Sequence, residues 1–303
     1  MNKQKLAYTY GIVTVLLWAT VASAFKISLT YLDPLNLLLY SSAFSTLILF
    51  FIVQFQRKWK LLKSYSKNDY KNSALLGFLN PFLYYAVLFE AYSLLPAQEA
   101  QPLNQIWAIV LSLLSILLLK QKIRFSNIFA IFVSFFGVLI VSTQGNIFAL
   151  NFSNPIGAAL ALGSTIIWSL FWIYNVKDER DDVTKLFLNF AFGLIYLFIF
   201  MLALSKIVVP NTFGLLGAAY IGFFEMGITF VAWLKALRLS ETTAQVSNLI
   251  YLVPFLSLIV IYFTIGETIL PSTIIGLILI VSGVLLQKRA ASHQRKKSNL
   301  TSQ

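Results

Sequence analysis

The sequence has few charged residues, no cysteine and a single histidine, and each shortage excludes a class of protein. Without cysteine, the chain cannot form a disulfide framework or a thiolate metal site. Only 11% of its residues are charged, whereas 58% are hydrophobic and the mean hydropathy is +0.79. This composition leaves too little polar surface to cover a water-soluble globule, so we predict an integral membrane protein.

Apolar runs long enough to cross a bilayer recur along almost the whole chain and leave no room for a sizeable soluble domain. They are solid blocks, unlike the short alternating strands of a membrane barrel, so the predicted fold class is an all-α membrane protein with ten transmembrane helices. The predicted helices span residues 5–25, 35–55, 73–94, 101–119, 127–144, 156–176, 186–205, 213–235, 243–264 and 272–287.

The loops between these helices place the basic residues on one side of the membrane. If the amino terminus is cytoplasmic, all of the 23 lysines and arginines except Lys26 and Lys206 fall in cytoplasmic segments. Dropping one helix would invert every later loop, so this skew favours ten helices and places both termini in the cytoplasm. Because the basic residues form no continuous footprint, the net charge of +12 indicates no nucleic-acid partner.

The two halves of the chain resemble each other. Three stretches of the first half align with stretches of the second: 79–95 with 224–240, 118–126 with 264–272, and 134–142 with 280–288. A repeat of five helices, an odd number, must insert its copies with opposite orientation. We therefore predict a first repeat over 1–146, an inverted second repeat over 147–288 and a basic cytoplasmic tail over 289–303. Inverted repeats are typical of secondary transporters, whose site lies between the halves near the bilayer midplane.

Several motifs carry a resemblance to a known family. The opening "GIVTVLLWATVASAFK", the segment "SNLIYLVPFLSLI", and the ending "GET" with "IIGLILIVSGVLLQ" resemble EamA-type permeases of the drug/metabolite transporter superfamily, over essentially the whole chain. The stretch "AQPLNQIWAIVL" is similar to the fourth-helix motif of amino-acid exporters of the YddG type, except that Ala108 follows Trp107 where that motif usually has proline. The resemblance implies a carrier of small metabolites with a central cavity lined mainly by the first, third, fourth, sixth, eighth and ninth helices.

Polar and aromatic residues fall at helical spacing on single faces of these helices, which predicts the same cavity from the residues alone. Pro81 is expected to bend the third helix and free a backbone carbonyl. Trp168 and Trp172 are compatible with cavity lining and with plain core packing. Trp18 and Trp233 lie on the matching faces of the first and eighth helices. The predicted substrate-binding residues are Glu225, Asn80, Tyr84, Gln101, Asn104, Trp168, Trp172, Thr229, Asn248 and Tyr251.

Glu225 is the strongest candidate, because the apolar run from Phe213 to Trp233 holds no other charge. A carboxylate facing hydrocarbon costs about 2.5 to 3.5 kcal/mol or more, so it must be neutralised, paired or exposed to a wet cavity. Three interpretations are open. Glu225 could exchange protons and so couple transport, it could hold the amine of a substrate, or it could stay protonated and bonded to a neighbour as a structural group. Its counterpart in the first half is Asn80.

The other acidic residues are left out of the predicted site. Glu90 and Glu99 lie near the outer ends of the third and fourth helices, where water access favours a solvated role over binding. Glu267 falls in an outer loop. The acidic patch "KDERDD" at 177–182 is typical of a solvated cytoplasmic turn.

An intramembrane enzyme is disfavoured by the residues present. The sole histidine, His293, lies in the tail and all five aspartates fall in predicted loops. A buried serine would therefore lack its histidine base, and paired-aspartate chemistry would lack its acids. No P-loop of the form GxxxxGK[ST] occurs, which argues against an ATP-driven pump. We predict no catalytic residue, no metal site and no cofactor.

These patterns together predict a secondary transporter in the cell (inner) membrane. It would export a small amine-containing metabolite, such as an amino acid, by alternating access with proton exchange. Its predicted partners are this small-molecule substrate and the lipid bilayer. Two alternatives use the same cavity: a ligand-binding membrane sensor, and an exporter of drugs or other non-amine metabolites.

Overall fold

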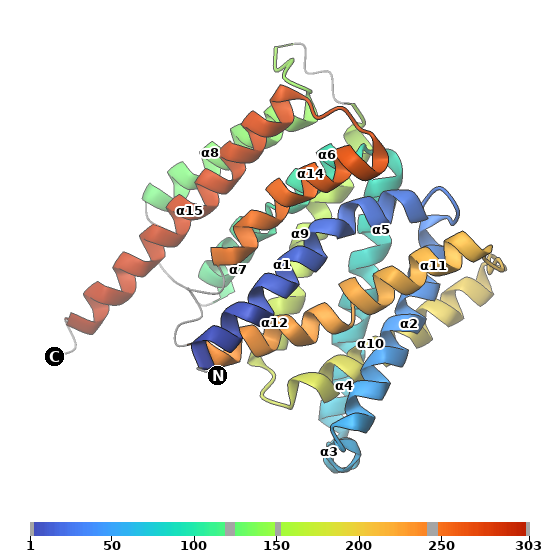
Figure 1. Ribbon diagram of the computed structural model, residues 1–303. Helices are drawn as coiled ribbons and strands as arrows, with labels where there is room; N and C mark the ends of the chain where they lie inside the picture. Colours follow the sequence, from blue (N-terminus) through green and yellow to red (C-terminus); the bar gives the residue numbers. More distant parts are fainter. Residues whose placement is uncertain (1–2, 119–124, 149–152, 241–247, 301–303) are drawn as a thin grey trace.

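Figure 1 shows the computed structural model, which describes residues 3–118, 125–148, 153–240 and 248–300. The regular structure in these ranges is entirely helical, which confirms the all-α prediction. Shorter apolar helices cover Phe132–Ser142, Leu249–Ile265 and Pro271–Leu286. Within the described ranges, six helical stretches are long and apolar enough to cross a bilayer: Lys3–Ser28, Pro34–Phe55, Lys67–Leu94, Pro155–Asn175, Asp182–Ala203 and Thr212–Leu239.

The helices follow one another in two series. The first contains α1 (Lys3–Ser28), α2 (Pro34–Phe55), α3 (Trp59–Ser64), α4 (Lys67–Gly77), η1 (Phe78–Leu83), α5 (Tyr84–Leu94), α6 (Ala97–Asn104), α7 (Trp107–Leu118) and α8 (Phe125–Ser142). The second contains α9 (Pro155–Lys177), α10 (Asp182–Ala203), α11 (Thr212–Tyr220), η2 (Ile221–Glu225), α12 (Ile228–Leu239), η3 (Asn248–Leu252), α14 (Val253–Ile265) and α15 (Pro271–Leu300). The helix α15 runs past residue 287, where the sequence had predicted its end.

Three of the predicted helices are interrupted. In η1, Asn80 leaves the helical conformation (φ −150°, ψ 120°) because the ring of Pro81 disfavours it, so the expected bend is confirmed. The predicted helices 101–119 and 213–235 were wrong in being continuous. The first breaks after α6, where the Ile106 N–H bonds only three residues back, to Leu103. The second breaks between η2 and α12, at Gly227.

Glycines bring the interrupted helices close to their neighbours in both series. A Cβ at Gly77 would lie 2.3 Å from the carbonyl oxygen of Asn189 on α10. A Cβ at Gly222 would lie 2.4 Å from the carbonyl oxygen of Ser41 on α2. Gly77 and Gly222 are aligned residues of the two halves. In each half, a glycine at this position lets the interrupted helix pack closely against its neighbour.

The helices α8 and α15 pack against each other at one edge of the bundle (Figure 1). Their backbones meet at Gly137 and Gly276, where a Cβ on either residue would lie 2.6 or 2.7 Å from the other's carbonyl oxygen. The outer face of α8 exposes Phe132 and Phe135, at 59% and 54%. Exposed aromatic rings of this kind suit a surface that faces lipid.

Candidate functional site

A cavity of about 660 Å³ lies in the middle of the bundle, within the size range of small-molecule sites. Its lining comes from α1, α5, α6, α7, α9, η2, α12, η3 and α14, the segments predicted as the first, third, fourth, sixth, eighth and ninth helices. Among the described lining residues, Glu225 is the acid and Lys177 is the basic residue. Five of the six tryptophans of the chain line the cavity: Trp18, Trp107, Trp168, Trp172 and Trp233.

The two ends of the cavity differ in their exposure. Where α9 and α12 finish, the lining residues Lys177 and Leu237 are exposed and half-buried, respectively. At the opposite end, Phe25, Leu88 and Tyr92 are each no more than 2% exposed. The cavity is therefore open toward Lys177 and closed toward Phe25.

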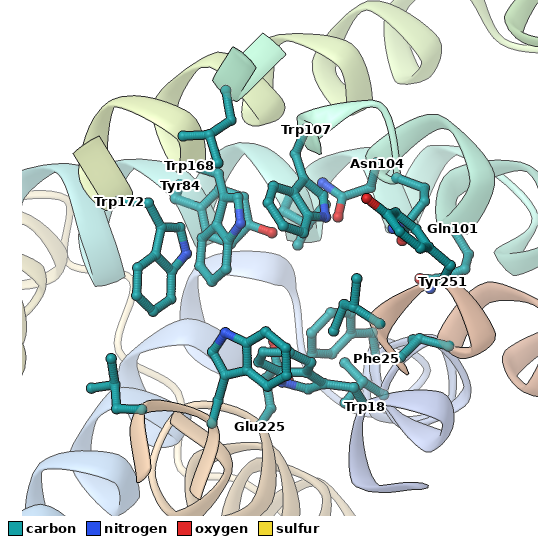
Figure 2. Close-up of a pocket in the computed structure, with 18 of the residues that line it drawn as sticks. Trp18, Phe25, Tyr84, Gln101, Asn104, Trp107, Trp168, Trp172, Glu225 and Tyr251 are labelled. Atoms are coloured by element: carbon teal, nitrogen blue, oxygen red, sulfur yellow. The ribbon is translucent and has the colours of Figure 1, made fainter. Parts of the chain in front are cut away.

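Glu225 projects into the cavity from η2, at the break in its helix (Figure 2). Its side chain is 7% exposed, and its Oε1 accepts a hydrogen bond of 3.0 Å from the Tyr85 hydroxyl. Its Oε2 has no hydrogen-bond partner within the described part of the chain. Trp18 lies beside it, and the indole N–H interacts with the carboxyl without a well-directed hydrogen bond. Glu225 is thus a buried acid with one oxygen left for a ligand or a proton.

The aromatic residues form two facing walls. Tyr84, Trp107 and Trp168 stand opposite Trp18 and Glu225 in Figure 2. The rings of Tyr84 and Trp168 lie 4.5 Å apart with 31° between their planes. The predicted choice between lining and packing does not arise for Trp168, because its ring does both.

Amide side chains lie on the same wall as Trp107 (Figure 2). Asn104 donates through Nδ2 to the Ser164 hydroxyl at 3.0 Å, and Gln101 accepts from the Tyr92 hydroxyl at 2.8 Å. Gln105 also lines the cavity, and its Nε2 is a buried donor with no partner in the described ranges. This wall therefore offers amide donors opposite the Glu225 carboxyl.

The remaining predicted site residues lie in different places. Tyr251 lines the cavity from η3 and is half-buried. Asn80 does not line it: the side chain is fully buried in η1, and neither amide atom has a partner among the described residues. Thr229 is also fully buried, and its hydroxyl donates to the carbonyl oxygen of Phe224. The Asn248 side chain lies outside the described residues.

Sequence reasoning missed Phe25, Tyr92 and Lys177 as lining residues. Phe25 follows Trp18 by seven residues on one helical face, so helical spacing could have found it. The sequence analysis placed Lys177 in a cytoplasmic turn, because the predicted helix ended at residue 176. The structure places it at the open end of the cavity.

The closed end is tied to the end of α5 by Lys26. Its Nζ donates to the carbonyl oxygens of Tyr92 at 2.9 Å and Leu95 at 2.7 Å, the last carbonyls of that helix. Beneath it, the ring of Phe25 contacts those of Phe89 and Tyr92, with centroids 4.7 and 5.2 Å apart. A lysine at this position satisfies carbonyls that the helix leaves without partners.

Two acids near this end accept hydrogen bonds from distant parts of the chain. Glu99 is 1% exposed and accepts hydrogen bonds from Gln144 and Ser153. Glu267 accepts from the first two backbone N–H groups of α6, at 2.9 and 3.0 Å. The solvated role predicted for Glu99 was therefore wrong, because its two partners are distant in the sequence. Glu267 had been assigned only to an outer loop.

The turn at 177–182 is also less solvated than predicted. Arg180 bonds Asp178 at 2.5 Å, and the two side chains are 8% and 4% exposed. Burial alone would raise the pKa of the Asp178 carboxyl, but the hydrogen bonds and charge of Arg180 hold that pKa below its ordinary value. Lys58, which follows α2, bonds Asp181 at 2.6 Å. Arg180 also donates to the Asp69 carbonyl oxygen and the Ser73 hydroxyl on α4, so these contacts connect the ends of α2, α4, α9 and α10 on the open side.

No three histidine, cysteine, aspartate or glutamate side chains gather as possible metal ligands in the described ranges. Comparison with known proteins gives relatives along the whole chain. An uncharacterized transporter of Archaeoglobus fulgidus is 27% identical over 286 residues, which cover 93% of this chain and 96% of the relative. An uncharacterized transporter of Clostridium kluyveri is 25% identical over 313 residues, covering 98% and 99%.

A solved crystal structure of another protein superimposes with a TM-score of 0.66, covering 95% of this chain and 98% of that one, at 19% identity. This likeness shows the fold. The model of the EamA-like transporter family matches twice, over residues 5–143 and 155–287. Because these matches cover most of both halves, the chain belongs to the EamA-like transporter family and is a multi-pass membrane transporter, not an enzyme.

Proposed function

We propose that the protein is a secondary transporter that exports a small amine-containing metabolite, such as an amino acid, from the cytoplasm by alternating access. The observation that carries this proposal is the carboxyl of Glu225, buried and half-paired inside a cavity walled by tryptophan. An acid in such a place is stabilised by a cation or a proton, and the rings around it favour a cation as well.

The proposed topology is ten membrane spans in two inverted repeats, with both termini in the cytoplasm. The family model matches once in each half, and the interrupted helices fall at aligned positions, η1 in the first half and η2 in the second. The basic loops support the orientation. In this topology the cavity is open to the cytoplasm, the side from which an exporter takes its substrate.

The polar groups of the cavity suggest one orientation for an amino acid. Its ammonium would bind the free Oε2 of Glu225, and its carboxylate would bind amide donors on the opposite wall, such as the Gln105 Nε2. The side chain would then lie between the rings of Trp168 and Trp18. The similarity of this helix to the YddG-type motif is consistent with such a substrate.

Glu225 is proposed to couple transport to protons in addition to binding the amine. When the substrate cation leaves on one side of the membrane, the carboxyl can take up a proton there. It then stays protonated while the empty cavity reorients to the other side. The Tyr85 hydroxyl can bond one oxygen in either state, because it can donate to a carboxylate and to the carbonyl oxygen of a protonated carboxyl, the first bond being the stronger.

A second candidate is the export of bulky cationic drugs. It is favoured by the lining itself, whose described residues include five tryptophans and a single acid. Such a substrate would use Glu225 and the rings and would leave the amide wall without a partner.

A thermal-unfolding screen of the purified protein in detergent separates these candidates. Ligands would be amino acids, polyamines, nucleosides and cationic drugs, tested on wild type, on Glu225→Gln and on Glu90→Gln, which removes an exposed acid. A ligand at a hundred times its Kd adds about 2.7 kcal/mol of stability. We expect amino acids to stabilise wild type and Glu90→Gln but not Glu225→Gln. A response confined to bulky cations would select the second candidate, and no response at any pH would overturn the amine proposal.

A further inference from the structure

We propose that a groove on the side of α12 away from the cavity binds an anionic phospholipid of the cytoplasmic leaflet. An acyl chain would lie in the groove, and the headgroup would bind Lys235. This site is separate from the central cavity, and the inference does not depend on the proposed substrate. The assignment to the cytoplasmic leaflet alone uses the topology proposed above.

The groove has a volume of about 330 Å³, half that of the central cavity. It lies where the beginning of α1 and the ends of α2 and α12 meet, on the same side of the bundle as the open mouth of the cavity. Its described lining residues are Tyr10, Ile52, Phe55, Gln56, Ile228, Val231, Ala232 and Lys235. Apart from the glutamine and the lysine, these side chains are apolar or aromatic, so the groove suits a hydrocarbon chain.

The helix α12 separates the groove from the cavity. The residues that it contributes to the groove follow the spacing of one helical face: Ile228, Val231, Ala232 and Lys235. Trp233, Leu234 and Leu237 project from the other face and line the cavity. A lipid in the groove would therefore support the back of a cavity wall, on the segment that begins after the break at Gly227.

The groove lies at the ends of its helices, where the membrane meets water. Gln56 ends α2, and Lys235 lies one turn before Leu239, the last residue of α12. Phe55, at the end of α2, is 83% exposed, and Tyr10 is half-buried. A lysine and a tyrosine at this level are typical of the membrane interface, where the lysine stem packs along apolar surface and the ammonium reaches water.

Lys235 supplies the charge that an anionic headgroup needs. It is exposed, and its Nζ lies 5.6 Å from the centroid of the Tyr10 ring. Arg238, one turn further along α12, is already bonded to Asp182 at 2.6 Å, whereas Lys235 has no ion pair among the described residues. Arg57, just past the end of α2, is also exposed. Basic residues at the surface of an anionic membrane each gain about 1 kcal/mol, so this rim favours a negative headgroup.

An anionic phospholipid satisfies both parts of the site. A soluble anion at Lys235 would leave the apolar groove unfilled, and a lipid with a zwitterionic headgroup would bring no net negative charge to the ammonium. A negative headgroup joined to an acyl chain fills the groove and pairs the ammonium at once.

Thermal unfolding of the purified full-length protein in detergent tests this proposal. Phosphatidylglycerol and phosphatidylcholine with identical oleoyl chains would be titrated separately, because a ligand that binds the folded protein raises its Tm. We expect phosphatidylglycerol to raise the Tm at a lower concentration than phosphatidylcholine does. Lys235→Gln should weaken the apparent affinity for phosphatidylglycerol about fivefold, the equivalent of about 1 kcal/mol, and leave that for phosphatidylcholine unchanged. Lys235→Arg should keep the wild-type affinities.

A second pair of variants tests the groove itself. Ile52→Trp places a large ring among the lining residues, and Leu47→Trp places the same ring at an exposed position of α2 outside them. Ile52→Trp should weaken the binding of both lipids, whereas Leu47→Trp should bind them as wild type does. Each Tm is compared with that of the same variant without lipid, so a loss of stability does not imitate a loss of binding.

The remaining controls decide which molecule the site takes. Lys71→Gln, which removes an exposed lysine on α4, should change neither affinity. Equal losses with Lys71→Gln and Lys235→Gln, or an equal response of wild type to both lipids, would overturn a specific headgroup site. A rise in Tm with glycerol phosphate alone would assign Lys235 to a soluble anion, and an unchanged response of Ile52→Trp would place the acyl chain elsewhere. Either result would overturn the proposal. No step requires transport, so a wrong amine assignment leaves the test unaffected.

Discussion

The two halves interrupt the same helix at aligned positions but place different chemistry there. In the first half, η1 buries Asn80 completely, away from the cavity and with both amide atoms unpaired among the described residues. In the second, η2 presents Glu225 to the cavity and pairs it with Tyr85. The glycines that seat the two breaks are equivalent, so the backbone device is common to both. At this position only the second half carries an acid. Both halves therefore supply the interrupted backbone, and one half supplies the acidic side chain.

The largest effect is expected from Glu225→Gln, which puts an amide at this position in both halves. We expect it to abolish transport driven by a pH gradient, because the amide cannot exchange a proton. Uptake into proteoliposomes, with and without the gradient, measures this. Glu90→Gln should transport like wild type. Substrate counterflow that survives the change would assign coupling alone to Glu225, and its loss would assign binding as well. Unchanged gradient-driven transport would return Glu225 to a structural role.

The shared scaffold predicts the next effect. Gly77→Ala and Gly222→Ala should each lower stability by about 1 to 3 kcal/mol, because the added Cβ meets a backbone carbonyl that cannot move aside. Gly163→Ala on α9 is the matched control, since its added Cβ would have no described neighbour within 4 Å apart from the local backbone of its own helix. It should be neutral or stabilising by about 0.5 to 1 kcal/mol. Thermal unfolding in detergent compares the three. A large difference between Gly77 and Gly222 would show that the halves do not share this contact.

A smaller effect is expected from Trp168→Ala on the cavity wall. Losing one aromatic ring from the cavity wall should weaken apparent substrate affinity about tenfold, or about 1.4 kcal/mol, while the amount of expressed protein stays the same. Trp59→Ala is the control, because Trp59 is the tryptophan that does not line the cavity. Transport measured over a range of substrate concentrations gives the affinities. A loss of yield without a change in affinity would make Trp168 a packing residue.

Much of the fold could be predicted from the sequence, for a physical reason. The length and periodicity of apolar runs report burial directly, and they gave the all-α fold and the segments that line the cavity. Glu225 stood out because an acid in an apolar run is costly anywhere. The breaks near Gln105 and Gly227 depend instead on how helices meet in three dimensions. The burial of Glu99 depends on Gln144 and Ser153, which lie 45 and 54 residues away.

The smallest effect is expected at Asn80, the counterpart of Glu225 in the first half. Asn80→Leu should leave transport unchanged and raise stability by up to about 1 kcal/mol. A buried amide without partners costs about 1 to 3 kcal/mol, and leucine of similar shape has no polar atom to satisfy. Asn154→Leu is the opposite control, because Asn154 caps α9 by accepting from the Gly157 N–H, and its loss should cost about 1 kcal/mol. If thermal unfolding shows Asn80→Leu to be as destabilising as Asn154→Leu, the Asn80 amide has a partner. The first half would then contribute polar chemistry of its own, and the two interruptions would be more alike than their side chains suggest.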